Sequence, residues 1–237
     1  MKKLDENFWE KYFRVYDVLN AVIPYQELLD ELEKELGLSQ EDIVLDVGSG
    51  TGNLMVRLKS KCKKIIGLDF SDEGIKAHKD KDQDAEAILF DITQKFPFDD
   101  DYFSKVVSNN VIYTLDGEQQ NKTLTEILRV LKPGGKFVIS NVKKGFSPIK
   151  IYTDHIAKSI KKAGFLKTIS SFFILFVPTL KMFYYNKKIK NSGGAKHYNF
   201  LKVGEQKRML ENLGFVKISE EKLVYSGQAV MNNCYKA

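Results

Sequence analysis

The sequence predicts an α/β fold in which helices cover both faces of a mostly parallel sheet. Between residues 43 and 141, short apolar runs alternate with segments of helical periodicity, which is the pattern of parallel strands joined by helices. A glycine-rich turn, residues 48–52, joins the first apolar run to the next helix. Near the C-terminus, two apolar segments flank Ser226-Gly227, which is typical of an antiparallel hairpin.

Each expected element follows from its periodicity and its boundary residues. Residues 4–36 have helical periodicity with a break near Pro24, and Gly37 is expected to end the helix. Strands are predicted at Ile43–Val47, Lys64–Asp69, Ala85–Asp91, Lys105–Asn109 and Lys136–Asn141. Helices are predicted over Asn53–Ser60, from the second strand through His78, and over Gln119–Leu131, where Lys132-Pro133-Gly134-Gly135 forms a turn. A last helix, Gly204–Leu213, is expected before the hairpin strands Phe215–Tyr225 and Gln228–Lys236.

Residues 142–203 interrupt this alternation and are predicted to form a helical cap insertion. Helices are expected over Thr153–Ala163 and Leu166–Tyr185, with a kink near Pro178, followed by a loop from Lys187 to Lys196. The chain is therefore expected to divide into an N-terminal helical segment, residues 1–36, a main ligand-binding domain, residues 37–141 and 204–237, and the cap.

Composition limits the class of protein. The longest strongly apolar run, Phe172–Leu180, is shorter than the roughly 20 residues needed to span a bilayer. Met1–Lys11 lacks the apolar core of a signal peptide. The two cysteines, Cys62 and Cys234, give neither a disulfide framework nor metal-ligand spacing. We therefore expect a cytoplasmic protein without a metal site.

Basic residues are concentrated in one segment. Residues 141–202 contain thirteen lysines and one acidic residue, Asp154, among many aromatic residues. Such asymmetry favours an anionic partner, with peripheral contact to an anionic membrane preferred and nucleic acid as the weaker alternative. A plain solvated face would have the same composition.

The segment Val44–Leu54 is the most informative for function. Asp46 precedes Gly48-Ser49-Gly50-Thr51-Gly52, where small residues let the backbone approach a ligand near a helix N-terminus. A dinucleotide fingerprint needs glycine where Asn53 stands, and the lysine of a P-loop is missing. The pattern therefore favours a nucleoside ligand without a pyrophosphate, although a tight turn with Asp46 as a helix cap would give the same residues.

Polar residues end the next three predicted strands. Asp69 ends the second strand and is expected to bind ribose hydroxyls, with Phe70 packing on adenine. Asp91, followed by the apolar Ile92, ends the third strand, and Asn109 ends the fourth. Because open α/β sheets bind ligands at the carboxyl ends of their strands, we expect these side chains to surround one crevice.

Together these motifs resemble the class I S-adenosylmethionine-dependent methyltransferases over roughly residues 12–141 and 199–236. The matching stretches are Val44–Leu54, Gly67–Ser71, Phe90–Phe98 and Leu128–Ser140. The resemblance implies a Rossmann-like, seven-stranded fold and S-adenosyl-L-methionine as cofactor. The residues expected to contact it are Tyr16, Asp46, Gly48, Ser49, Gly50, Thr51, Asp69, Phe70, Asp91, Ile92 and Asn109.

Within this class, Tyr16-Asp17-Val18-Leu19-Asn20 resembles the Tyr-Asp-x-x-Asn stretch of the ubiquinone/menaquinone biosynthesis C-methyltransferases, which carry the type 11 methyltransferase domain. Residues 108–113, in contrast, lack that group's Ser-Phe-Gly-Leu-Arg pattern. We expect methylation of a small hydrophobic acceptor, quinone- or lipid-like. The alternatives are an RNA methyltransferase or RNA-binding module, and a cofactor-binding protein without methylation activity. Tyr16, Tyr113 and His197 are candidates on the acceptor side, whereas His78 is expected to face solvent.

Overall fold

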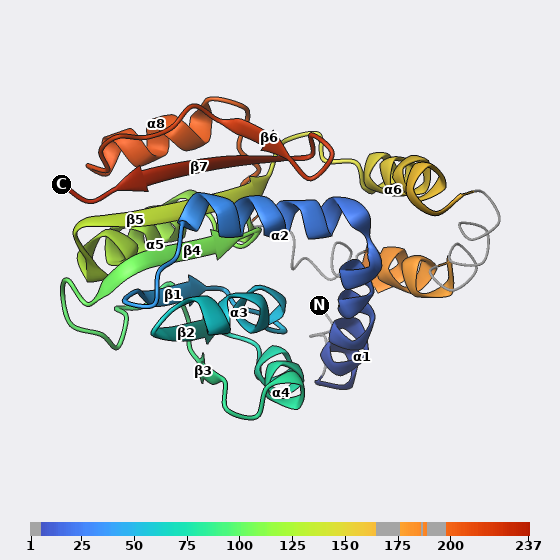
Figure 1. The fold of residues 1–237 in the computed structure, drawn as a ribbon, viewed down its shortest axis with the longest axis horizontal. Helices are drawn as coiled ribbons and strands as arrows, with labels where there is room; N and C mark the ends of the chain where they lie inside the picture. The colour runs from blue at the N-terminus through green and yellow to red at the C-terminus, as the bar shows by residue number, and fades with distance from the viewer. Residues whose placement is uncertain (1–5, 165–175, 186, 189–197) are drawn as a thin grey trace.

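A computed structural model describes residues 6–164, 176–185, 187–188 and 198–237, whose strands form one seven-stranded sheet in the order β3-β2-β1-β4-β5-β7-β6 (Figure 1). The first five strands run parallel, and β7 is antiparallel to both β5 and β6. The bounds are β1 Ile43–Val47, β2 Lys64–Asp69, β3 Glu86–Leu89, β4 Phe103–Asn109, β5 Leu131–Val142, β6 Lys222–Val224 and β7 Ala229–Tyr235. The predicted fold class is confirmed.

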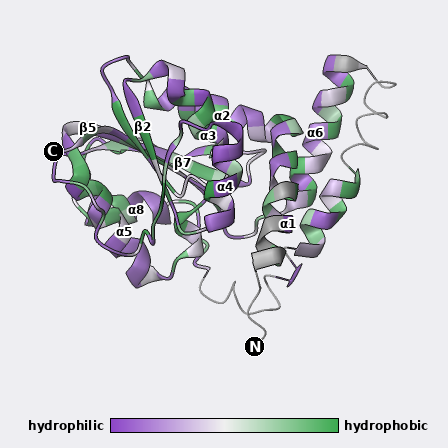
Figure 2. Cartoon of the chain, turned by 90° about the horizontal axis from the view of Figure 1, so that it is seen from below, coloured by the Kyte–Doolittle hydropathy of each residue, from purple (hydrophilic) through white to green (hydrophobic). Residues whose placement is uncertain are grey.

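Alternate residues of each central strand enter two separate cores. Val44 of β1 packs into the core beneath α2, Ile23–Leu36, and α3, Asn53–Leu58. Its neighbour Leu45 packs into the opposite core, beneath α5, Gly117–Val130, and α8, Glu205–Asn212. This alternation reflects the two-residue repeat of a strand covered on both faces, and Figure 2 shows the hydrophobic strands between helices of mixed hydropathy.

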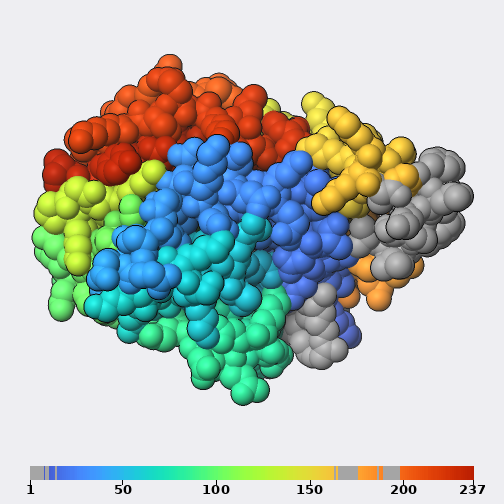
Figure 3. Space-filling view, in the orientation of Figure 1, coloured from blue at the N-terminus to red at the C-terminus, as the bar shows by residue number. Residues whose placement is uncertain are grey.

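The N-terminal segment breaks into three short elements. α1, Glu6–Tyr16, leads through the 3-10 turn η1, Asp17–Ala21, into α2. Pro24 occupies the first turn of α2, where a missing N–H costs nothing, so the predicted break lies before the proline. Gly37 ends α2 in the left-handed conformation, as expected. In Figure 3 this segment lies between the cyan surface that follows β1 and the yellow-to-orange insertion.

The remaining elements differ from expectation mainly at their ends. α4 spans Asp72–Lys81, and the 3-10 turns η2 and η3 cover Lys59–Lys61 and Ile112–Thr114. Within the predicted strand Phe215–Tyr225 only β6 forms a ladder, and Val216 makes an isolated bridge to Tyr235. Lys217, which adopts a positive φ, interrupts the strand between them.

Most of the insertion that the structure describes is helical. α6 spans Pro148–Ala163 and begins before the predicted Thr153, since Pro148 suits the first turn of a helix. Residues 176–185 are also helical, whereas residues 165–175 and 189–197 of the predicted second helix and loop lie outside the described residues. Among the described helices, none is long and apolar enough to cross a membrane.

Candidate functional site

A cavity of about 640 Å³ lies where the carboxyl ends of β1, β2 and β4 meet the N-terminal segment. This volume lies within the roughly 300–1,000 Å³ of small-molecule sites. Every candidate residue that the structure describes lines this cavity, and they come from five parts of the chain. They are Tyr16, Asp46, Gly48, Ser49, Gly50, Thr51, Asp69, Phe70, Asp91, Ile92, Asn109 and Tyr113. His197 lies outside the described residues.

The glycine loop, residues 48–52, is held tightly against β2. The Gly48 and Ser49 N–H groups donate to the Leu68 carbonyl at 2.7 and 3.0 Å, and Gly50 N–H donates to Asp69 Oδ2 at 2.8 Å. These three amides are therefore used within the protein. A ligand is therefore expected to be bound chiefly by the side chains and the shape of the cavity.

Two glycines of the loop are required by close contacts. Gly48 and Gly52 have φ of +82° and +74°. A Cβ at Gly48 would lie 2.2 Å from Val111 Cγ2, and one at Gly52 would lie 2.0 Å from His78 Cδ2. The loop thus packs directly on both side chains, a contact that other residue types would prevent.

His78 does not face solvent, and that expectation was wrong. Its side chain is completely buried beneath Gly52 on the inner face of α4. Burial lowers the pKa of the imidazole, with nearby Lys81 as a further cause. Neither ring nitrogen has a hydrogen-bond partner among the described residues. The neutral ring therefore acts as an apolar support for the loop.

Three carboxylates lie in the cavity wall, each in a different environment. Burial raises the pKa of Asp46 to about 7, with a further contribution from Asp69. Burial also raises the pKa of Asp69, although Asp69 accepts hydrogen bonds from the Gly50 and Ser71 N–H groups. For Asp91 burial acts in the same direction, but bonds from the Thr93 N–H and hydroxyl outweigh it and lower the pKa.

Another part of the cavity wall, called the aromatic end below, is formed by aromatic side chains, and most of these residues were missed in the sequence. α1 contributes Tyr12 and Phe13, α2 contributes Tyr25, and the end of the insertion contributes Tyr198. Tyr113 packs edge-to-face on Tyr198, with ring centroids 5.6 Å apart. The helical spacing of residues 12, 13 and 16 could have indicated a common face, but not which surface that face meets.

Burial keeps the phenols of this end uncharged. It raises the pKa of Tyr16 to about 12, with Asp69 and Asp17 as further causes, and raises the pKa values of Tyr12, Tyr113 and Tyr198. The described lining includes no lysine, arginine or histidine. Because its acidic groups are carboxylates and uncharged phenols, the cavity favours a ligand with a cationic group and an uncharged part.

Of the described residues of the insertion, only Tyr198 lines the cavity. α6 packs against α2, and Ile151 enters the core. Residues 176–185 reach α1 through Tyr185, whose ring lies 5.3 Å from that of Phe8, centroid to centroid. The N-terminal segment therefore separates most of the described insertion from the cavity.

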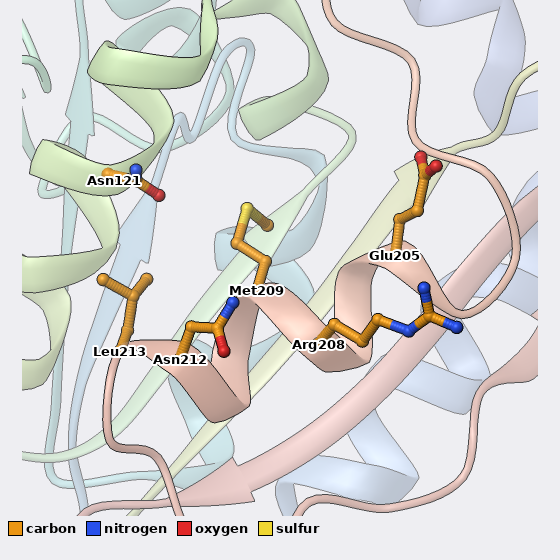
Figure 4. Close-up of a pocket in the computed structure, with 6 residues that line it drawn as sticks. All are labelled: Asn121, Glu205, Arg208, Met209, Asn212 and Leu213. Atoms are coloured by element: carbon orange, nitrogen blue, oxygen red, sulfur yellow. The ribbon is translucent and has the colours of Figure 1, made fainter.

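A second, smaller hollow of about 360 Å³ lies between α5 and α8 (Figure 4). Its lining is Asn121, Glu205, Arg208, Met209, Asn212 and Leu213. It contains none of the candidate residues. Among the described residues, no group of three or more His, Cys, Asp or Glu could hold a metal ion.

Comparisons with known proteins agree with the motifs. Residues 45–139 match the family model described as "Methyltransferase domain". The chain is 29% identical over 179 residues to the ubiquinone/menaquinone biosynthesis C-methyltransferase UbiE of Geobacter sp. (strain M21), covering 65% of this chain and 75% of the relative. It is 27% identical to the demethylmenaquinone methyltransferase of Oceanobacillus iheyensis, covering 97% and 93%.

Solved structures share the fold at lower identity. A chain of the Haloferax volcanii complex between the Trm112 activator and a methyltransferase superposes with a TM-score of 0.66 at 15% identity, covering 99% of both chains. The [4+2]-cyclase SpnF superposes with a TM-score of 0.59 at 15% identity, covering 90% of this chain and 81% of that chain. At these identities the likeness shows the fold alone.

Proposed function

This chain belongs to the class I S-adenosylmethionine-dependent methyltransferases of the UbiE-like type, and from that premise we propose that it methylates a small, uncharged, hydrophobic acceptor, quinone- or lipid-like. The observation that carries the proposal is that one cavity combines three carboxylates with a cluster of aromatic side chains. The first suits a cationic nucleoside cofactor, and the second suits a neutral acceptor.

The carboxylates of the cavity fit S-adenosylmethionine. Asp69 has oxygen lone pairs left for ribose hydroxyls, although its Oδ2 accepts from the Gly50 N–H and its Oδ1 from the Ser71 N–H. Asp46 is a buried acceptor suited to the cofactor's amino group. Phe70 is 70% exposed beside them and offers a ring for adenine. Asn110 also lines the cavity. Its Oδ1 atom is buried and has no hydrogen-bond partner among the described residues.

The aromatic end supports an uncharged acceptor. Tyr12, Phe13, Tyr113 and Tyr198 offer apolar surface with polar tips. A phosphate-bearing acceptor would meet carboxylates and no cationic side chain in the described lining. This charge pattern weighs against RNA as the substrate, whose binding depends on Lys and Arg contacts to phosphate.

Orientation and water exclusion are the main contributions expected from the protein. S-adenosylmethionine, when bound, supplies an activated methyl group, and alignment of two reactants can contribute about 7–11 kcal/mol. Tyr16 and Tyr113 would hold the acceptor through protonated hydroxyls, because burial keeps their pKa values high. They serve as donors and do not act as strong bases near neutral pH.

Calorimetry with S-adenosylhomocysteine tests the cofactor assignment. We expect micromolar-range binding, and NAD binding without a response to S-adenosylhomocysteine would contradict the proposal. Asp69→Ala should weaken binding by about 10- to 150-fold, since charge-assisted bonds contribute about 1.5–3 kcal/mol. A loss of affinity below threefold would mean that Asp69 only accepts backbone hydrogen bonds, as from Gly50, and does not bind the cofactor. Turnover with a panel of quinols, lipids and RNA separates methylation from mere cofactor binding.

We also propose that the protein acts in the cytoplasm and makes peripheral contact with an anionic membrane. Val177, Leu180 and Tyr184 lie on one helical face and are each more than 50% exposed. Lys181, in the same helix, and Lys187 are also outside the core. Apolar side chains beside lysines are typical of a helix lying in the interface of a bilayer.

Co-sedimentation with vesicles tests this contact. Anionic phosphatidylserine vesicles should retain the protein at low salt, and Lys181→Glu with Lys187→Glu should abolish retention. The matched control, Lys63→Glu with Lys132→Glu, changes two exposed lysines outside the insertion by the same charge and should bind normally. Equal loss in both double variants would indicate only a net-charge effect. Retention by RNA and not by vesicles would favour the nucleic-acid alternative.

A further inference from the structure

A polar cluster beside the cavity joins the N-terminal segment to the glycine loop. The Lys81 ammonium, at the end of α4, donates to Asp17 Oδ1 at 2.7 Å, to the Thr51 carbonyl at 2.8 Å and to Asn53 Oδ1 at 2.7 Å. Thr51 Oγ1 also donates to Asp17 Oδ1, at 2.8 Å. Asn20 Nδ2 donates to Asn53 Oδ1 at 2.9 Å. Three stretches that are distant in the sequence, represented by Asp17, by Thr51 and Asn53, and by Lys81, thus meet at one cation.

Lys81 does not line the cavity, but its partners connect it to both sides of the site. Thr51 and Asn53 are lining residues of the loop and of α3. Asp17 directly follows Tyr16, a lining residue of α1. An ammonium has three N–H donors, and these three contacts occupy all of them. The position of α1 relative to the loop therefore depends on Lys81.

α1 is a wall of the cavity and not an outer appendage. It supplies Tyr12, Phe13 and Tyr16 to the lining. It packs against α4, and Tyr185 of the insertion packs on its outer side. Displacement of α1 would open the aromatic end to water, whereas methyl transfer needs an enclosed site.

We propose that Lys81 is a positioning residue. It couples closure of α1 and η1, residues 6–21, to occupation of the glycine loop by the cofactor. The inference rests on the proposed function, because the coupling requires that the loop bind S-adenosylmethionine. A ligand that binds the closed form better also stabilises it, and the effect is reciprocal. Closure of α1 should therefore strengthen cofactor binding.

Two measurements on the full chain test the coupling. Calorimetry gives the affinity for S-adenosylhomocysteine, and hydrogen exchange gives the protection of residues 6–16 with and without that ligand. Lys81→Met and Asp17→Ala should each weaken binding by about 5- to 30-fold and remove the ligand-induced protection of α1. Lys81→Arg keeps the charge and donors, so it should remain within about threefold of wild type.

A neighbouring ion pair provides the matched control. Lys59 donates to both carboxylate oxygens of Asp82 at 2.7 Å, beside Lys81 at the same end of α4. This ion pair ties the end of α4 to η2. Among the described residues, it does not reach the glycine loop or residues 6–21. Lys59→Met should leave both readouts unchanged. When Lys81→Met and Asp17→Ala are combined in one chain, their losses of binding free energy should be clearly less than additive.

Several outcomes would overturn the coupling. They are an unchanged affinity in Lys81→Met, an equal loss in Lys59→Met, or additive losses in the double variant. Weaker binding with normal ligand-induced protection of α1 would mean that Lys81 acts on the loop alone, which also contradicts the proposal. Failure of the wild-type chain to bind S-adenosylhomocysteine would instead overturn the proposed function and the coupling together. The two failures are therefore distinguishable.

Discussion

At the scale of single residues, Asp46 has the most unusual environment in the site. Its carboxyl is 2% exposed at the end of β1, and burial with the neighbouring Asp69 raises its pKa from 3.8 to about 7. Near neutral pH the ligand-free protein therefore holds this group partly protonated. A cationic amino group placed beside it would favour the ionised form and lower that pKa.

Binding of S-adenosylhomocysteine should therefore release protons from Asp46 between about pH 6 and 7.5. Because the bound form needs the carboxylate, affinity should rise as the pH rises through about 7 and then level off. Calorimetry in buffers of different ionisation enthalpy measures the proton release. In Asp46→Asn the release should disappear and the affinity should be weaker and flat with pH. Undiminished release in this variant would assign the proton to another group.

At the scale of elements, the loop from β1 to α3 combines positive φ with close packing. Gly50 and Gly52 both have positive φ, but a Cβ at Gly50 would have no neighbour within 4 Å, whereas one at Gly52 would overlap His78. The pair therefore separates the cost of the backbone conformation from the cost of overpacking.

Gly50→Ala should lower the free energy of unfolding by about 1–2 kcal/mol, the cost of a left-handed conformation. Gly52→Ala should cost about 1–3 kcal/mol more, because the methyl group overlaps the buried imidazole. Urea denaturation of the ligand-free variants measures both values. Equal losses would show that His78 moves aside at little cost and does not support the loop rigidly.

At the scale of the whole molecule, polar contacts between described residues join α6 of the insertion to α2. Ile23 N–H donates to His155 Nδ1 at 3.1 Å, and Lys158 pairs with Glu27 at 2.6 Å. The first contact requires an unprotonated Nδ1. Burial lowers the pKa of His155, although nearby Asp154 acts in the opposite direction.

This contact should make docking of α6 sensitive to acid. A histidine with a lowered folded-state pKa stabilises the fold above its unfolded pKa of 6.5, and that contribution is lost as the pH falls through the folded-state value. Wild type should therefore lose more stability between pH 7.5 and 5 than His155→Gln, which cannot titrate. Urea denaturation at both pH values checks this. Equal losses of stability in the two proteins would mean that His155 does not cause the sensitivity to acid.

Much of the fold and part of the site were predictable from local patterns. The mostly parallel strands, the loop conformation and the carboxylates at the strand ends follow from the two-residue repeat, from glycine at positive φ, and from the rule that parallel strands share one ligand-binding edge. The end of β6 and the start of α6 were less predictable, because neighbouring turn residues and Pro148 decided them.

The sequence by itself determined the class of fold, the cofactor-type motif and the presence of a basic, aromatic insertion. Only the tertiary structure decided what faces what. It buried His78 beneath Gly52, brought Tyr12 and Phe13 into the same cavity as Asp69, and put α1 between the cavity and most of the described insertion. The physical reason is that local periodicity sets which face of a helix is apolar, whereas the surface covering that face depends on contacts between residues far apart in the chain.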